Sequence, residues 1–491
     1  MSTSSTPSAP SAPSASSEPP PRETVPESGA LNGRGWGVLF VLCGAIFLEG
    51  IDVAMLNVAL PSIRADLGMS TGELQWVMSA YVVGYGGFML LGGRAADLFG
   101  RRQMFLLWLT VFLLFSGLGG FADDGPTLIV ARFVTGVAAA FMTPAGLSII
   151  TTSFEEGPQR DKALLIYSGT GGGGFSVGLV VGGLLTSADW RWVFFAPVVL
   201  SFLILIAALA LVPKSPRPDR TGQRVDLLGA LTVTGAIVLL VLAVERAAHT
   251  GLGQTLGTLA AGLVLLTAFV LTERRAAAPL VRLGIFRSGA LVRANLSALF
   301  FAGGFFGFQF IAVLYLRELR GWSTVETSLA LLVIGIDAAL SPTLTPKLVN
   351  RFGNARVVFG GLVLAALSYA LFLPVGEDWT YAAMFPSFIA LGLAFSLAYG
   401  PLTIIATEGV QEEEQGLAGG LLYTSFQFGA ALGLSTVTAV NVAATGEDGS
   451  PQSLLDGYHA ALLVPLIAAG VATLISAFGL RGRPRDGAAA T

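Results

Sequence analysis

Long apolar stretches follow one another along the chain after its first 34 residues, and short polar segments separate them. A helix needs about 20 apolar residues to cross a hydrocarbon core about 30 Å thick, and each stretch has about that length or more. The polar–apolar alternation of membrane β-strands is absent, so the stretches predict transmembrane helices. The fourteen predicted spans are 36–59, 73–93, 104–122, 127–152, 163–187, 192–212, 226–245, 254–272, 291–316, 324–348, 357–374, 381–408, 417–442 and 458–480.

The composition agrees with a membrane protein. Of the 491 residues, 53% are hydrophobic and 12% are charged, whereas soluble domains carry about 25% charged residues. The chain has two histidines and one cysteine, Cys43, which leaves little material for metal sites or disulfides. The net charge of −3 argues against nucleic-acid binding. We therefore expect an all-α polytopic membrane protein that is not an enzyme and has no catalytic residues, metal, cofactor or nucleic-acid partner.

The predicted spans fall into three groups. Residues 1–34 are rich in Ser, Pro and Ala and are expected to form a disordered tail. Six spans follow in residues 35–213 and six more in residues 289–481, while residues 214–288 form a linker with two extra spans. Residues 482–491 form a short second tail. Two similar six-helix halves around a midplane site are how many secondary transporters are built.

Positive charge is distributed unevenly between the two sides of this arrangement. If the N-terminus is cytoplasmic, 22 of the 28 Lys and Arg residues fall on the inner side, when Arg293 and Lys347 at the inner ends of their spans are counted with the inner segments. The outer segments hold Arg64, Arg191, Arg246, Arg317 and Arg320. Cytoplasmic segments are enriched in Lys and Arg, so both termini are predicted to be cytoplasmic.

The segment between the second and third predicted spans reads Gly-Gly-Arg-Ala-Ala-Asp-Leu-Phe-Gly-Arg-Arg, from Gly92 to Arg102. Glycines allow a tight reversal between two helices, and a carboxylate among arginines provides a charged contact at the membrane surface. We interpret the segment as a conformational latch; the alternative is a basic loop that only orients the protein. The latch residues are Gly93, Asp97, Gly100, Arg101 and Arg102.

This segment resembles the signature between spans 2 and 3 of the major facilitator superfamily, and the chain looks most like its fourteen-span drug–proton antiporter branch. Further matches are Ile51-Asp52, Asn57-Val58-Ala59-Leu60-Pro61, Leu74-Gln75-Trp76-Val77 with Tyr81, Ala131-Arg132 with Gly136 and Pro144, Trp190-Arg191-Trp192-Val193-Phe194, Phe286-Arg287 and Gly416-Leu417-Ala418. The resemblance implies the major facilitator fold, with two six-helix halves plus two extra central spans, and proton-coupled multidrug efflux.

Three positions depart from the family pattern. Thr135 stands where Gln is usual, and Asn350 stands where Asp is common. Gly178-Leu179 replaces the Gly-Pro of the antiporter signature, so a kink is less expected there. Since that signature is taken to mark the direction of transport, an importer stays among the alternatives.

Ionisable residues inside a span are energetically costly, so each one is a functional hypothesis. Asp52 and Arg132 lie at similar expected depths, about 12 Å and about 8 Å from the outer ends of their spans. An Asp that faces an Arg stays ionised, whereas an Asp in an apolar pocket holds its proton, so parting the two can load and release a proton. Glu49 shares the helical face of Asp52. The family resemblance implies a proton-coupling role for these residues; the alternative is a static ion pair.

Asp337 lies near the middle of the span 324–348, without a charged neighbour close to it in that span. In some family members an acid in this span contacts cationic substrates. We expect Asp337 and Glu49 to bind substrate, with Phe305 as an aromatic wall for flat apolar molecules. The alternatives are a protonated Asp337 that is hydrogen-bonded to the facing half, and a Phe305 that faces lipid.

The fifth predicted span carries a series of small residues at four-residue spacing, which lets membrane helices approach closely. Packing is the expected role, because halves that rock against each other also need such a surface. The residues singled out are Gly174, Gly178, Gly182 and Gly183.

These features together predict a secondary active transporter that exports amphipathic, often cationic, small molecules in exchange for protons. It is expected to be a multi-pass monomer of the plasma membrane, with the lipid bilayer, protons and a small-molecule substrate as its partners. Two alternatives stay open within transport, an exporter dedicated to one metabolite and an importer. A membrane receptor on the same fold is a third.

Overall fold

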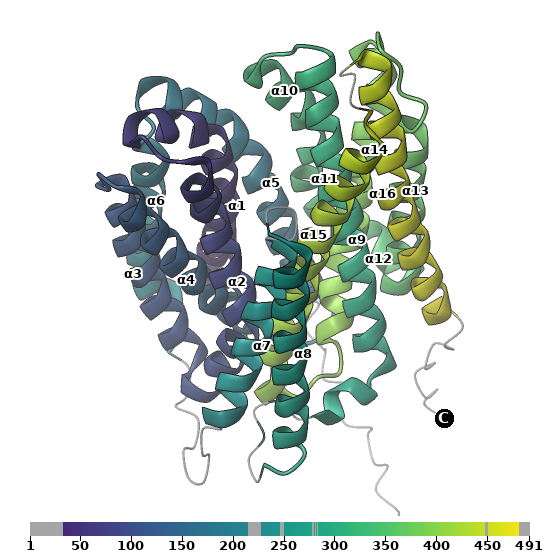
Figure 1. Ribbon diagram of the computed structural model, residues 1–491. Helices are drawn as coiled ribbons and strands as arrows, with labels where there is room; N and C mark the ends of the chain where they lie inside the picture. Colours follow the sequence, from purple (N-terminus) through teal and green to yellow (C-terminus); the bar gives the residue numbers. More distant parts are fainter. Residues whose placement is uncertain are drawn as a thin grey trace, which may run out of the picture.

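The computed structural model of the protein describes residues 33–214, 227–245, 250–276, 279, 281, 283–446 and 450–480. Regular secondary structure in these ranges is helical, and two helical bundles stand side by side in Figure 1. The predicted tails, apart from Gly33 and Arg34 at the start of the first helix, lie outside the described residues, as does most of the basic segment after the sixth span.

Six helices form the first half. They are α1 (Gly33–Leu67), α2 (Thr71–Phe99), α3 (Arg101–Gly120), α4 (Gly125–Ser153), α5 (Pro158–Ala188) and α6 (Trp192–Leu211). α1 packs along α5 and α2 packs along α4, while α3 and α6 lie on the outside of the bundle. Side chains such as Leu114 and Phe202 are exposed on α3 and α6, as expected for helices that face lipid.

Local sequence signals set several helix ends. Ser70 and Glu73 form a capping box at the start of α2, and the hydrogen bonds from Ser70 hold the pKa of Glu73 below its usual range. Asp124 accepts a hydrogen bond from the backbone N–H of Thr127 at the start of α4. Gly100 has a φ of 101°, which favours glycine and permits the reversal between α2 and α3.

The second half has the same general plan with one interruption. Its segments are α9 (Gly289–Leu314), a π-helical turn (Tyr315–Leu319), α10 (Thr324–Leu331), a 3-10 segment (Leu332–Ile336), α11 (Asp337–Thr343), α12 (Thr345–Phe352), α13 (Asn354–Phe372), α14 (Tyr381–Thr407), α15 (Gln415–Ala444) and α16 (Pro451–Leu480). The predicted span 324–348 is confirmed between Val325 and Thr343, but it contains a 3-10 segment and is interrupted at Leu344. Pro342 and Pro346 cannot donate backbone hydrogen bonds, which fits the break between α11 and α12.

The two extra helices are α7 (Leu227–Glu245) and α8 (Leu252–Glu273). They pack against each other, and α7 also contacts α2 of the first half and α15 of the second. Its valines Val238 and Val241 fill the space beside Gly87 and Gly86 of α2. The insert thus covers one seam between the halves.

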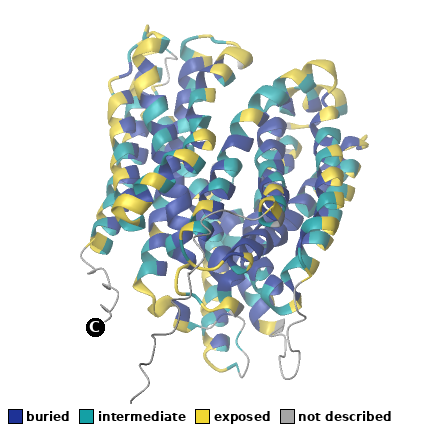
Figure 2. Cartoon of the chain, turned by 180° about the vertical axis from the view of Figure 1, so that it is seen from behind, coloured by how far each residue is buried: buried dark blue, intermediate teal, exposed yellow. Residues whose placement is uncertain are grey.

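The described residues contain thirteen helical stretches that are long and apolar enough to cross a membrane, and a shorter apolar helix at Leu228–Val244 within α7. Together they confirm the fourteen-span membrane fold. Buried residues lie where the helices face one another, and exposed residues lie on the outside and at the ends of the bundle (Figure 2).

The halves meet mainly where α2 contacts α15 and where α5 contacts α11 and α14. We define the latch end of the bundle as the end that carries the α2–α3 turn at Gly100. The halves diverge toward the opposite end, where α10 stands apart from α1 (Figures 1 and 2).

Candidate functional site

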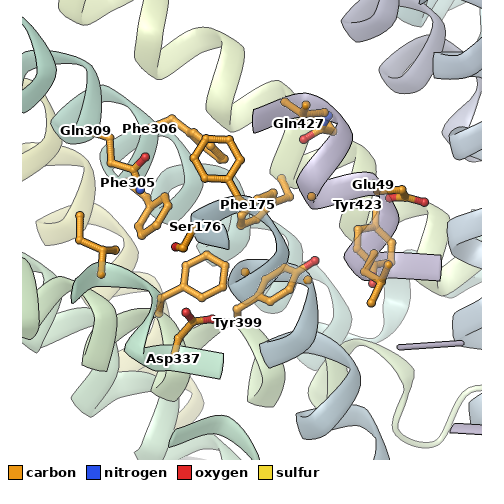
Figure 3. Close-up of a pocket in the computed structure, with 18 of the residues that line it drawn as sticks. Glu49, Phe175, Ser176, Phe305, Phe306, Gln309, Asp337, Tyr399, Tyr423 and Gln427 are labelled. Carbon is orange, nitrogen blue, oxygen red and sulfur yellow. The ribbon is translucent and has the colours of Figure 1, made fainter. Parts of the chain in front are cut away.

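A cavity lies between the two halves, near the middle of α1, α9 and α14 (Figure 3). Nine of its twenty lining residues are aromatic and come from both halves, and a few polar side chains lie among them. Glu49 comes from the first half and Asp337 from the second, and both line the cavity. The aromatic side chains in the wall are Tyr81, Tyr85, Phe175, Phe305, Phe306, Phe395, Tyr399, Tyr423 and Phe426.

Asp52 and Arg132 form a buried ion pair behind this wall. Arg132 Nη1 donates a hydrogen bond of 2.7 Å to Asp52 Oδ2, and each side chain is 2% exposed. The Arg132 guanidinium carbon lies 4.4 Å from the centre of the Tyr81 ring, at cation–π distance. Since Tyr81 itself lines the cavity, the ion pair is one aromatic ring away from it.

Glu49 is held by two hydroxyl groups of its own half. Tyr85 donates a hydrogen bond of 3.0 Å to Oε2, and Thr143 donates one to Oε1. Tyr85 also stacks on Tyr81, with ring centres 5.7 Å apart. The chain Glu49–Tyr85–Tyr81–Arg132–Asp52 therefore links the cavity to the ion pair through direct contacts.

Asp337 has very different surroundings. It begins α11 directly after the 3-10 segment, and its side chain is 2% exposed. Its Oδ2 atom has no hydrogen-bond partner among the described residues. The backbone N–H groups of Asp337 and Ala338 interact with the carboxyl group, and a Cβ added to Gly172 would meet its Oδ2 atom and the ring of Phe395.

The glycines of α5 serve two opposite contacts. Gly174, Gly178 and Gly182 face α1, where an added Cβ would lie within 2.8 Å of α1 backbone or side-chain atoms. Gly169, Gly172 and Gly173 instead face Ser341, Asp337 and Ala338 of α11. Gly183 differs from the expected packing role, because its nearest neighbour, Val58, is 4.0 Å from the built Cβ position.

The α2–α3 turn contacts the start of α15. Asp97 accepts hydrogen bonds of 3.1 Å from the backbone N–H groups of Gly416 and Leu417, and Arg101 Nε lies 4.0 Å from Asp97 Oδ1. Arg101 also donates to the carboxylate and the backbone carbonyl of Glu412, at 3.0 and 2.6 Å. Glu412, the first residue of the 3-10 turn Glu412–Glu414, is thus part of this contact.

Two other latch residues have separate geometric roles. Gly93 lies against the backbone of Gly416, where no side chain fits. Arg102 does not reach the second half; it donates to the carbonyls of Val212 and Leu209 at the end of α6, both at 3.0 Å. The expected latch is thus composed of an inter-half part and an intra-half part.

Sequence reasoning missed a second contact between the halves at the latch end. The buried Arg160 of α5 donates to the carbonyl of Thr407 at 3.2 Å and to Oε1 of Gln415 at 3.3 Å. Glu156 accepts from Arg160 at 3.1 Å and from the backbone N–H of Gly409 at 3.3 Å. Arg160 lies near a span end in the sequence, where a charge needs no special explanation, so nothing marked it.

Thr143 and Tyr423 were also missed. Both are ordinary residues of apolar helices when the sequence is considered alone, and only the tertiary contacts bring them to the cavity region. Phe305, by contrast, lines the cavity as expected, and it lies 4.8 Å from Phe395, ring centre to ring centre.

Comparison with known proteins shows which family the chain resembles. The profile of the Major Facilitator Superfamily matches residues 42–434. The puromycin resistance protein pur8 of Streptomyces alboniger is 36% identical over 91% of this chain and 92% of its own length. The cephamycin export protein CmcT of Amycolatopsis lactamdurans is 33% identical over 86% of this chain and 87% of its own length.

A solved structure shows the same fold at low sequence identity. The human organic anion transporter MFSD10 superposes with a TM-score of 0.64 at 14% identity, covering 88% of this chain and 99% of that chain. The profile match, the two relatives and the fourteen-span bundle agree with one another. The chain is an integral membrane protein and belongs to the major facilitator superfamily of transporters.

Proposed function

We propose that the protein exports amphipathic, often cationic, small molecules in exchange for protons, by alternating access of the central cavity. Residues 35–213 and 289–481 act as the two moving halves, and residues 214–288 form the insert between them. Because this mechanism moves the substrate without altering it, it needs no cofactor, metal or catalytic residues.

The observation that carries the proposal is the chain of contacts from Glu49 to the Asp52–Arg132 ion pair. Buried ionisable groups in membrane helices mark ion and proton pathways. Here a carboxyl group in the cavity wall contacts a tyrosine pair, which in turn covers a buried arginine and its partner acid. Movement or protonation of a group in the cavity wall can therefore affect the ion pair through direct side-chain contacts.

The second half supplies the substrate contact in this proposal. Asp337 is a buried carboxyl group in an aromatic cavity, and a carboxylate attracts an organic cation far more strongly in such a site than in water. Phe305 and the neighbouring rings offer flat apolar surfaces. Glu49 can contact the same molecule from the first half.

The contacts at the latch end act as the inner gate. Asp97 and Arg101 of the latch, together with Arg160, hold the halves together at that end while the other ends diverge. The arrangement resembles an outward-facing state if the latch end is cytoplasmic. Breaking these contacts then opens the cavity toward the cytoplasm.

We propose the plasma membrane as the location, with both termini cytoplasmic and the monomer as the transporting unit. Cysteine labelling tests the orientation. In a Cys43→Ser background, a cysteine added at the C-terminus should react with membrane-impermeant reagents only after the cell membrane is opened. Reaction in intact cells would contradict the orientation and with it the assignment of the inner gate.

Transport in proteoliposomes tests the function itself. With purified full-length protein and an imposed pH gradient, the wild type should accumulate doxorubicin against its concentration gradient, and an ionophore that removes the pH gradient should abolish this. Downhill flux that does not depend on the pH gradient would contradict proton coupling. Binding of doxorubicin without any flux would instead support a receptor.

A dedicated exporter is the second candidate, because the relatives carry the names of single antibiotics, puromycin and cephamycin. A toxicity panel in cells that lack their own efflux pumps separates the two. Resistance to several unrelated cations supports broad efflux, and resistance to one compound alone supports dedicated export.

A further inference from the structure

Two polar atoms in the cavity wall have no hydrogen-bond partner among the residues that the structure describes. They are Oδ2 of Asp337 and the hydroxyl oxygen of Tyr423. Both side chains are almost fully buried, at 2% and 3% exposure. Buried polar groups are nearly always hydrogen-bonded in folded proteins. Two unpartnered groups in the wall of one cavity therefore point to a ligand that supplies both partners.

The two groups lie in different parts of the cavity. Asp337 lies below Ser176 on one side in Figure 3, and Tyr423 lies beside Glu49 on the other. The side chains between them include Phe175 and Tyr399. The hydroxyls of Tyr399 and Tyr167 are near that of Tyr423, but they do not reach hydrogen-bond geometry with it. A ligand that meets both groups must cross the aromatic part of the cavity.

The two groups call for different ligand chemistry. An ionised Asp337 only accepts hydrogen bonds and favours a cationic donor. The hydroxyl of Tyr423 is neutral and can donate to a carbonyl or ether oxygen. The neighbouring Glu49 already accepts hydrogen bonds from Tyr85 and Thr143, so the hydroxyl of Tyr423 is the donor left over on this side.

We propose that the cavity binds a two-ended molecule, with a protonated amine at Asp337, a flat apolar body between the rings and a neutral oxygen acceptor at Tyr423. This deepens the proposed function, on which it rests for the statement that the bound molecule is the transported one. It makes Tyr423 a specificity-determining residue for the oxygen and Asp337 one for the amine.

Three probes test the two contacts separately in binding assays on the purified full-length protein. Doxorubicin has an amine and quinone oxygens, its aglycone doxorubicinone keeps the oxygens without the amine, and tetraphenylphosphonium has charge without an oxygen. Asp337→Asn should weaken doxorubicin and tetraphenylphosphonium by about 30-fold and leave the aglycone within twofold. Tyr423→Phe should weaken doxorubicin and the aglycone by about fivefold and leave tetraphenylphosphonium unchanged.

Tyr369→Phe is the matched control. Tyr369 is a buried tyrosine of the same half, its hydroxyl also lacks a partner among the described residues, and it does not line the cavity. This variant should bind all three probes like the wild type. Equal losses for all probes in Tyr423→Phe, or no loss for any, would overturn the two-ended site, the latter by showing that water satisfies the hydroxyl.

The binding assay does not depend on transport. If the crossed pattern appears but the proteoliposomes show no proton-driven flux, the two-ended site stands and the proposed function fails. If flux is proton-driven but both variants affect all probes alike, the function stands and the two-ended site fails.

Discussion

The two carboxyl groups in the cavity wall, Glu49 and Asp337, are both buried and yet have different hydrogen-bond partners. Glu49 receives hydrogen bonds from Tyr85 and Thr143 and is connected through aromatic contacts to a buried arginine. Asp337 has a glycine backbone and a phenylalanine ring beside it, and one of its oxygens is unpartnered among the described residues. Burial alone therefore does not determine what an acid in this cavity can do.

This difference leads us to expect different roles for the two six-helix halves. Glu49 has its hydrogen-bond partners within the protein, whereas the unpartnered oxygen of Asp337 carries a desolvation cost that a ligand in the cavity can remove. We therefore expect variants near Glu49 and Asp52 to affect coupling for every substrate. Variants near Asp337 should affect substrates according to their charge.

The largest expected effect concerns the region of Glu49 and Asp52. Asp52→Asn removes the charge that faces Arg132 and cannot carry a titrating proton, so proton-driven uptake into proteoliposomes should fall by at least about 100-fold. Asp66→Asn, which alters the exposed ion pair with Arg191, is the control and should transport normally. Thermal unfolding verifies that the variant folds. Wild-type accumulation by Asp52→Asn would remove this residue from coupling.

Asp337→Asn tests the other carboxyl group of the comparison. Initial rates at low substrate concentration should fall by about 30-fold for cationic compounds and stay within twofold for neutral compounds of similar size. The pH dependence of the remaining neutral-substrate flux should match the wild type, because Asp52 and Arg132 are intact. Equal losses for neutral and cationic compounds would mean that Asp337 is structural or carries the proton, and the comparison would then fail.

Gly172→Ala sharpens the comparison without changing any charge. A Cβ at this position would meet the Asp337 carboxyl group and lie 3.0 Å from the ring of Phe395, so the acid must shift. Such overpacking should raise KM for cations by about tenfold, with proton coupling preserved. Gly183→Ala in the same helix has room for the methyl group and should be neutral. A neutral Gly172→Ala would show that the position of Asp337 is not critical.

The smallest expected effect lies outside both carboxyl sites. Asp97→Asn weakens the contact with the backbone of Gly416 and Leu417, so turnover should slow by about fivefold while KM changes little. Arg102→Gln, whose hydrogen bonds stay within the first half, should change the turnover less. A rise in KM with normal turnover would contradict this expectation, because it would mean that the contacts at the latch end affect substrate binding rather than the conformational change.

The contact between the α2–α3 turn and the segment before α15 illustrates how far sequence reasoning extends. The run from Gly92 to Arg102 marked the α2–α3 turn, because glycines and charges at a helix reversal are a local pattern. Its partner Glu412, in the turn before α15, is 311 residues away from Arg101 along the chain, and no local pattern connects the two. Arg160 contacts Thr407, which is 247 residues away, and no local sequence pattern marked Arg160 as an inter-half contact.

The sequence by itself determined the helical spans, the six-two-six grouping and the presence of buried acids, because span length, hydropathy and capping depend on neighbours a few residues apart. Only the tertiary structure decided that the span around Asp337 is interrupted, that the glycines of α5 face two different helices, and that Glu49 is satisfied while Asp337 is not. The physical reason is that hydrogen bonding and steric fit are set by atoms from distant helices. Thr143 and Glu49, for example, are 94 residues apart in the chain and in direct contact in the fold.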